Sequence, residues 1–172
     1  MFKRGVSPVV ATVLLLVLTV GLASVIFSFV IPFVNDQLGN SKACLKVLDG
    51  VEFADSKFNC YNVSTTDTGF ETGFSFKVKK ADVLGVRISF IDENGNSDVK
   101  DFPYDVDDSN FKAVGSSYGQ ALNNFPTAGG QRTYVSNKKY GSAEIAPLTE
   151  SGDVCAVSDV VQFSYCGEDV AF

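Results

Sequence analysis

Hydrophobic residues form an unbroken stretch near the start of the chain. None of the 29 residues from Val6 to Val34 is charged. Such a run exceeds the roughly 18 apolar residues that can cross the hydrocarbon core of a bilayer. Ser7 and Pro8 predict the helical start, because serine caps free N–H groups and proline fits the first turn. We therefore expect a helix over residues 6–38, about 50 Å long at ~1.5 Å per residue, with Pro32 kinking or ending its apolar part.

After residue 38 the pattern changes to short stretches with alternating apolar residues. From Phe70 to Val78 the apolar side chains recur at even spacing, which is the period of a strand with one buried face. Residues 83–91 predict the next strand, and Asn94-Gly95 is the strongest hairpin pattern in the chain, leading into residues 99–104. Residues 159–165 predict a late strand. Further strand candidates are residues 43–51, 60–65, 132–135 and 142–145.

Many short strands separated by turn residues predict an antiparallel β-sandwich or a small β-barrel-like domain. Of the 15 phenylalanines, 11 lie after residue 34, which is enough aromatic material for a substantial core. No convincing amphipathic helix follows residue 41, and residues 105–130 are the least regular stretch, so we expect the longest loops there. The predicted fold class is α+β, with a long N-terminal apolar α-helix followed by a β-rich globular domain over residues 39–172.

Charged residues are distributed unevenly along the chain. All 20 acidic residues lie at or after Asp36, together with 12 basic residues, so this part has a formal charge of −8. An acidic surface repels phosphates, so no nucleic-acid partner is expected. Lys3 and Arg4 precede the apolar run, and the positive-inside rule keeps them on the cytoplasmic side. The β-rich domain is therefore predicted to lie outside the cell.

Four cysteines, Cys44, Cys60, Cys155 and Cys166, lie in the polar part of the chain. Their even number fits two disulfides in an oxidising compartment, which agrees with the predicted orientation. Free thiols in a cytosolic protein are the alternative. The lack of histidine and of C-x-x-C spacing argues against zinc. Of the three possible pairings we favour Cys44–Cys60 and Cys155–Cys166, because each closes a hairpin-sized loop; a 15-residue loop is worth about 3 kcal/mol.

Patterns that support catalysis or cofactor binding are few. Without histidine a Ser-His-Asp or Cys-His arrangement is excluded, and there is neither a Walker-type glycine loop nor a dinucleotide-binding fingerprint. The stretch from Asp92 to Asp98 is rich in the oxygen ligands that calcium prefers but lacks the EF-hand spacing. A solvated hairpin tip is its better interpretation. We therefore predict no catalytic residue, no metal site and no cofactor.

Asn62-Val63-Ser64 has the form of an N-glycosylation sequon, and Asn62 is the predicted acceptor. Such a modification suits a domain that faces the outside of the cell. Short motifs of this kind also arise by chance, so an unmodified Asn62 is the alternative.

Three interpretations of the apolar segment compete. A cleaved secretory signal has an apolar region of only about 7–15 residues, and an uncleaved signal anchor is physically sufficient. The third rests on the stretch Lys3-Arg4-Gly5-Val6-Ser7-Pro8-Val9-Val10-Ala11-Thr12, which Val13-Leu14-Leu15-Leu16 follows. This arrangement resembles the start of archaeal type IV pilin precursors, in which a short basic leader ending in glycine precedes a long apolar helix. The resemblance covers the N-terminal segment alone.

The resemblance implies a leader peptide over residues 1–5, cut between Gly5 and Val6 by a prepilin peptidase on the cytoplasmic side. It also implies that the helix waits in the membrane and then packs against copies of itself in a filament core. Bacterial type IV pilins generally carry a glutamate at the position of Val10, whereas the archaeal type does not need it. An archaeal-type assembly is therefore the one implied.

The function implied by the resemblance is that of a structural subunit, a pilin, in a type IV pilus-like surface filament that serves adhesion. The β-rich domain would form the outer wall of this filament, and no enzymatic activity is expected. Two other functions stay open from the residues. One is a single-pass membrane-anchored extracellular binding protein, and the other is a minor pilin-like component of a filament apparatus.

Overall fold

The computed structural model describes residues 8–64, 69–104, 109–122, 125–167, 170 and 172, with the backbone alone at residues 36, 37 and 40. The chain divides into two compact units, Met1–Lys42 and Ala43–Phe172. The predicted leader and its cleavage site, Gly5 and Val6, lie outside the described residues.

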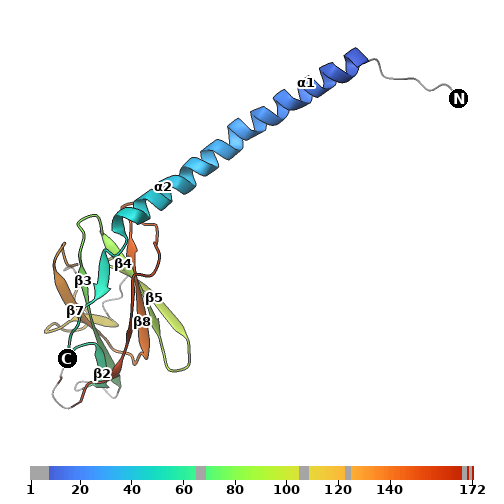
Figure 1. Ribbon diagram of the computed structural model, residues 1–172. Helices are drawn as coiled ribbons and strands as arrows, with labels where there is room; N and C mark the ends of the chain where they lie inside the picture. The colour runs from blue at the N-terminus through green and yellow to red at the C-terminus, as the bar shows by residue number, and fades with distance from the viewer. Residues whose placement is uncertain (1–7, 65–68, 105–108, 123–124, 168–169, 171) are drawn as a thin grey trace. The chain divides into compact units, whose positions relative to one another are not determined.

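The first unit is helical throughout its described part. The helix α1 (Pro8–Val25), the π-helical turn η1 (Ile26–Val30) and the helix α2 (Ile31–Val47) follow one another without a break (Figure 1). The hydroxyl groups of Thr12 and Thr19 each donate a hydrogen bond of 2.9 Å to the carbonyl three residues earlier. Polar side chains therefore fit into an apolar helix because the helix itself satisfies them.

Pro32 does not end the helix. In a regular α-helix its ring would clash with the carbonyl of Ser28, and it has no N–H to donate. The π-helical turn η1 comes directly before α2, and such a wider turn accommodates the proline. The helical run also passes the expected end at Leu38 and stops at Val47, in a last turn that Cys44 links to the β-rich unit.

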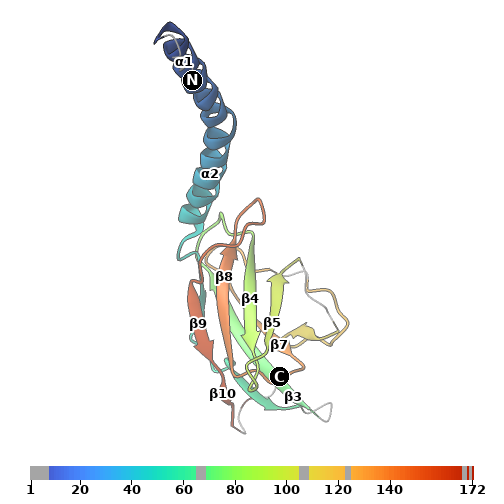
Figure 2. The ribbon, with the colours of Figure 1, turned by 90° about the vertical axis from the view of Figure 1, so that its right-hand side faces the viewer.

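The second unit is a two-layer β-sandwich. Among the described residues, one sheet has six strands, in the order β10-β2-β3-β7-β6 with β1 also paired to β3, and the other has four, in the order β5-β4-β8-β9. Figure 2 shows the four-stranded layer in front of β3 and β7. The strands are β1 (Val51–Phe53), β2 (Cys60–Val63), β3 (Phe70–Val78), β4 (Gly85–Ile91), β5 (Ser97–Phe102), β6 (Phe111–Ala113), β7 (Gln131–Ser136), β8 (Ser142–Leu148), β9 (Asp159–Gln162) and β10 (Ser164–Tyr165).

Aromatic rings dominate the core between the two sheets. Phe74 of β3 meets Phe90 of β4 edge to face, with ring centroids 4.9 Å apart, and stacks on Tyr134 of β7 at 5.9 Å. Burial raises the pKa of Tyr134 to about 12. The three side chains have almost no exposed surface. The abundance of phenylalanine therefore serves packing, as the composition indicates.

The predicted fold class, a long apolar α-helix followed by a β-rich domain, is confirmed. The strand predicted over residues 70–78 is β3, and Asn94-Gly95 lies in the turn between β4 and β5, where Gly95 has a φ of 83°. Residues 159–165 form two strands in different sheets, because Phe163 turns into the core between them. The strand β6 lies in the stretch expected to hold the longest loops.

Candidate functional site

The apolar helix has no buried residue in its first part, α1. Among the described residues, one helix is long and apolar enough to cross a membrane, Pro8–Asn35, with a mean hydropathy of 2.8. No residue of α1 is buried, and Leu15 is 68% exposed. Apolar surface of this kind costs about 25 cal/mol per Å² in water. The helix therefore requires lipid or other apolar surfaces around it.

Small residues leave room for close approach along this helix. A Cβ added to Gly21 would meet no atom within 4 Å. In membranes, helices approach one another most closely at such positions, because backbone can contact backbone. The helix can thus exchange a lipid environment for contact with another apolar helix without a change of conformation.

Two disulfides join distant parts of the β-rich unit, and the pairing expected from the sequence is wrong. Cys44 in the last turn of α2 is bonded to Cys155, with a Cα–Cα distance of 5.4 Å. Cys60 of β2 is bonded to Cys166, with a Cα–Cα distance of 5.0 Å. The expected bonds Cys44–Cys60 and Cys155–Cys166 are not formed.

The parallel pairing of β10 with β2 explains the difference. In this register Ser164 lies beside Cys60, and the N–H of Cys166 donates to the carbonyl of Tyr61 at 2.9 Å. The C-terminal strand therefore returns to the start of the domain and brings Cys166 to β2. Closeness in the sequence favours disulfides that close short loops, but the sheet topology decides which cysteines lie close enough to bond.

Asn62, the predicted glycosylation acceptor, lies on β2 and is half-buried. Its Nδ2 donates to the carbonyl of Val170 at 2.7 Å and to that of Gly167 at 3.4 Å. Its Oδ1 accepts from the N–H of Val63 at 2.8 Å. A glycan on Nδ2 would replace one of two amide hydrogens that the fold uses, so glycosylation stays a prediction.

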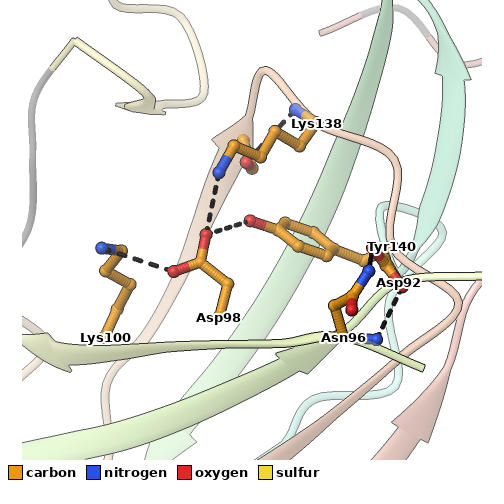
Figure 3. Close-up of polar contacts among 7 residues, drawn as sticks. Asp92, Asn96, Asp98, Lys100, Lys138 and Tyr140 are labelled. Atoms are coloured by element: carbon orange, nitrogen blue, oxygen red, sulfur yellow. Dashed lines mark hydrogen bonds and ion pairs between the residues drawn. The ribbon is translucent and has the colours of Figure 1, made fainter. Parts of the chain in front are cut away.

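A polar cluster centred on Asp98 joins the two sheets at one end of the sandwich. The Oδ2 of Asp98, on β5, accepts from the Tyr140 hydroxyl at 2.8 Å and from the Lys138 ammonium at 3.0 Å, and Lys100 lies 3.4 Å from Oδ1 (Figure 3). Lys138 and Tyr140 come from the connection between β7 and β8. Thr72 of β3 fixes that connection, because its hydroxyl donates to the Lys138 carbonyl and accepts from the Tyr140 N–H.

The cluster changes the ionisation of its members. Burial alone would raise the pKa of Asp98, but the hydrogen bonds from Lys138 and Tyr140 outweigh it, so this pKa lies below its usual range. Burial and the hydrogen bond to Asp98 raise the pKa of Tyr140. At neutral pH the carboxyl group is thus charged and the phenol neutral, which suits a structural link rather than proton transfer.

The neighbouring turn between β4 and β5 uses the carboxylate of Asp92. Its Oδ1 accepts from the N–H groups of Asn94 and Asn96, both at 2.8 Å, and its Oδ2 accepts from the Asn96 side chain at 2.8 Å. The Asn96 side chain contributes most to lowering the pKa of Asp92. The acidic stretch considered above for calcium is therefore a hairpin tip whose first carboxylate closes the turn.

A buried ion pair joins β3 to β6. The Lys112 ammonium on β6 lies 3.0 Å from Oε1 of Glu71 on β3, and their side chains are only 7% and 4% exposed. The hydroxyl of Tyr118 donates to the same oxygen at 2.8 Å. Burial and this contact raise the pKa of Tyr118. Asp98 ends the acidic stretch considered for calcium and Glu71 lies in the strand pattern of residues 70–78, but neither pattern predicts these contacts, so only the fold reveals the two clusters.

Comparison with known proteins adds one finding. Residues 4–40 match the family model described as archaeal type IV pilin, N-terminal. Comparisons with curated proteins and with solved structures gave no significant match. The matched segment contains the predicted cleavage site and the whole apolar segment Pro8–Asn35, whereas the β-rich unit Ala43–Phe172 lies outside it.

Proposed function

We propose that this chain, whose N-terminal region is that of an archaeal type IV pilin, is a structural subunit of a pilus-like surface filament. In this proposal the apolar helices pack together in the filament core and the β-rich units form the outer wall. The filament serves adhesion. Archaeal type IV pilins are structural proteins, and the proposal includes no catalytic role.

The observation that carries the proposal is the exposed apolar helix, which lies within the matched segment. Its side chains are apolar on all sides, and no residue of α1 is buried. A single anchor needs such a surface only in lipid, whereas a filament subunit needs it in two successive environments. Gly21, with open space around its Cα, suits the second environment.

Maturation involves two further partners in this proposal. The precursor lies in the membrane with its N-terminus in the cytoplasm, where Lys3 and Arg4 remain under the positive-inside rule. A prepilin peptidase removes residues 1–5 by cutting between Gly5 and Val6. The β-rich unit reaches the oxidising exterior, which agrees with its two disulfides.

The mature N-terminus and the assembly state test the proposal together. We expect chains recovered from filaments sheared off the cell surface to begin at Val6, as determined by mass spectrometry of N-terminal peptides. A detergent-soluble monomer that still begins at Met1, with no filaments in the sheared fraction, would show a membrane-anchored protein instead. The abundance of the chain in the filaments distinguishes a main subunit from a minor component.

A further inference from the structure

One end of the sandwich carries aromatic side chains that face the core side of the sheet but are left uncovered. Phe70 lies on the same face of β3 as Phe74, because side chains two and four residues apart share a face. Phe74 is fully buried, whereas Phe70 is 41% exposed. The six-stranded sheet therefore extends past the edge of the layer that covers it, and its inner face becomes a surface.

Two tyrosines on neighbouring strands extend this surface. The ring centroid of Tyr61 on β2 lies 6.2 Å from that of Phe70 and 6.0 Å from that of Tyr165 on β10. Tyr165 is 55% exposed. We call these three side chains, Tyr61, Phe70 and Tyr165, the aromatic strip. The ammonium group of Lys139 lies beside this strip, 4.3 Å from the ring centroid of Tyr61 and 4.9 Å from that of Phe70.

A hollow of about 540 Å³ opens beside the aromatic strip, and we call it the tip hollow. Phe70 forms part of its wall, and the cluster in Figure 3 supplies the polar part through Asp98 and Tyr140. Asn137 forms another part and also lines a second hollow of about 330 Å³, as does Phe70. Both volumes fall within the range typical of small-molecule sites.

The charges around the tip hollow balance. Its lining includes two carboxylates, Asp92 and Asp98, and two ammonium groups, Lys138 and Lys139. Each is engaged inside the protein: Asp92 closes the turn, Asp98 binds Lys138, and Lys139 lies 2.6 Å from Glu93. A ligand with a net charge would gain little from such a surface, whereas hydroxyl groups can both donate to and accept from these groups.

We infer that the tip hollow and the aromatic strip bind a neutral saccharide. A sugar ring has an apolar face whose C–H groups suit the negative face of an aromatic ring, and hydroxyl groups around its edge. Phe70 offers a ring in the wall of the tip hollow, and Asn137 and the Asp98 cluster offer hydrogen-bonding groups beside it. Tyr165 adds a second exposed ring farther along the aromatic strip, outside both hollows. The two hollows that share Phe70 accommodate adjacent sugar units. This inference rests on the proposed adhesive function, and it names neutral saccharides as the class of ligand to which the filament adheres.

The site also has a suitable place within the β-rich unit. Along β3, Val78 pairs with Val51 close to the last turn of α2, and Phe70 is the residue at the other end. Eight residue steps in a strand correspond to about 26 Å. The tip hollow therefore lies at the end of this unit opposite Val47, the last residue of α2.

Sugar binding by the full-length chain tests the inference. The chain is purified in a detergent without a sugar headgroup and mixed with the disaccharides maltose, lactose, mannobiose and chitobiose at about 10 mM, a concentration that detects dissociation constants near 1 mM. Saturation-transfer NMR reports binding. We expect at least one of them to bind, and Phe70→Ala and Asn137→Ala each to weaken binding roughly tenfold. Tyr104→Ala is the matched control, because Tyr104 is 67% exposed and lies outside both hollows.

Four results overturn the inference: binding of none of the four sugars, binding that Phe70→Ala leaves unchanged, equal loss in Tyr104→Ala, or stronger and salt-sensitive binding of a uronic-acid disaccharide. The urea midpoint of each variant shows whether it is folded. If Phe70→Ala does not fold, Asn137→Ala still tests the inference. Filament assembly is measured separately. If the wild-type chain binds sugar but forms no filaments, the proposed function alone is contradicted. If the wild type binds no sugar and Phe70→Ala loses filaments, the aromatic strip is a contact between subunits instead.

Discussion

Glu71 links β3 to residues beyond the neighbouring strand β7, at one edge of the six-stranded sheet. Its carboxylate receives both Lys112 of β6 and the hydroxyl of Tyr118, across the intervening strand β7. Breaking a buried ion pair from one side leaves a charge without compensation, which costs about 3–5 kcal/mol. Replacing both partners by apolar residues is often neutral. Losing one member of the Glu71–Lys112 pair should therefore destabilise the fold more than replacing both members.

We predict that Glu71→Gln lowers the free energy of unfolding by about 3 kcal/mol, because Lys112 then stays buried without a carboxylate. Urea unfolding of the disulfide-intact chain measures the effect. The double variant Glu71→Met with Lys112→Met is the control and should lie within about 1 kcal/mol of the wild type. Equal losses in the single and the double variant would contradict this explanation.

Asp98 makes stability depend on pH. Because its pKa is lower in the folded chain than the unfolded value of about 3.9, it stabilises the fold above that value, and this contribution is lost as the pH falls through the folded pKa. We predict that Asp98→Asn flattens the rise in unfolding free energy with pH in the acidic range below about pH 5. Urea titrations across this range measure the slope. A slope equal to that of the wild type would show that Lys138 and Tyr140 do not stabilise the charged carboxylate.

At the scale of elements, periodicity and turn chemistry predict much of the fold. The even spacing of apolar residues identifies β3, and Asn94-Gly95 identifies the hairpin, because both depend on neighbours in the sequence. The helix beyond Leu38 could not be predicted, since no apolar pattern supports it and a disulfide far along the chain holds its last turn. The strand β6 has three residues, too few for a recognisable period.

A charge inside the apolar helix should prevent its insertion. Leu18 lies near the middle of Pro8–Asn35 and is 63% exposed. We predict that Leu18→Lys raises the insertion free energy by about 3 kcal/mol and reduces the fraction of chain that resists carbonate extraction from membranes. Leu45→Lys is the matched control, because Leu45 is 67% exposed but lies beyond the apolar segment. Similar losses in both variants would point to helix stability instead.

At the scale of the whole molecule, the candidate surfaces differ in how far a sequence can reveal them. The apolar helix and its basic flank are continuous in the chain, so their pattern and resemblance can be read directly. The tip hollow combines Phe70, Asp98 and Asn137, three residues brought together only by the stacking of two sheets. Phe70 belongs to a strand pattern and Asp98 to an acidic stretch, but neither pattern predicts that the three residues meet. A site assembled from such distant segments becomes visible once the topology is known.

The two disulfides close overlapping loops, with sequence separations of 111 and 106 residues. Loops of this size are each worth about 4–5 kcal/mol in the chain-entropy account. We predict that Cys60→Ala with Cys166→Ala lowers the unfolding free energy by about 4 kcal/mol, measured with urea. The variant Cys44→Ala with Cys60→Ala is the control for pairing. It should lose both bonds and be less stable still, whereas the alternative pairing would leave Cys155–Cys166 intact.

The bond between Cys44 and Cys155 gives the chain a mechanical property. A pull transmitted along the apolar helix reaches Cys44 and passes through the covalent bond to Cys155, so the 111-residue separation between them is closed to extension. With this bond and the Cys60–Cys166 bond both reduced, the segment between Cys44 and Cys155 could extend to roughly 400 Å. We therefore expect a subunit under tension to behave as a short tether when oxidised and a long one when reduced, a contrast that single-molecule stretching with and without reductant would measure.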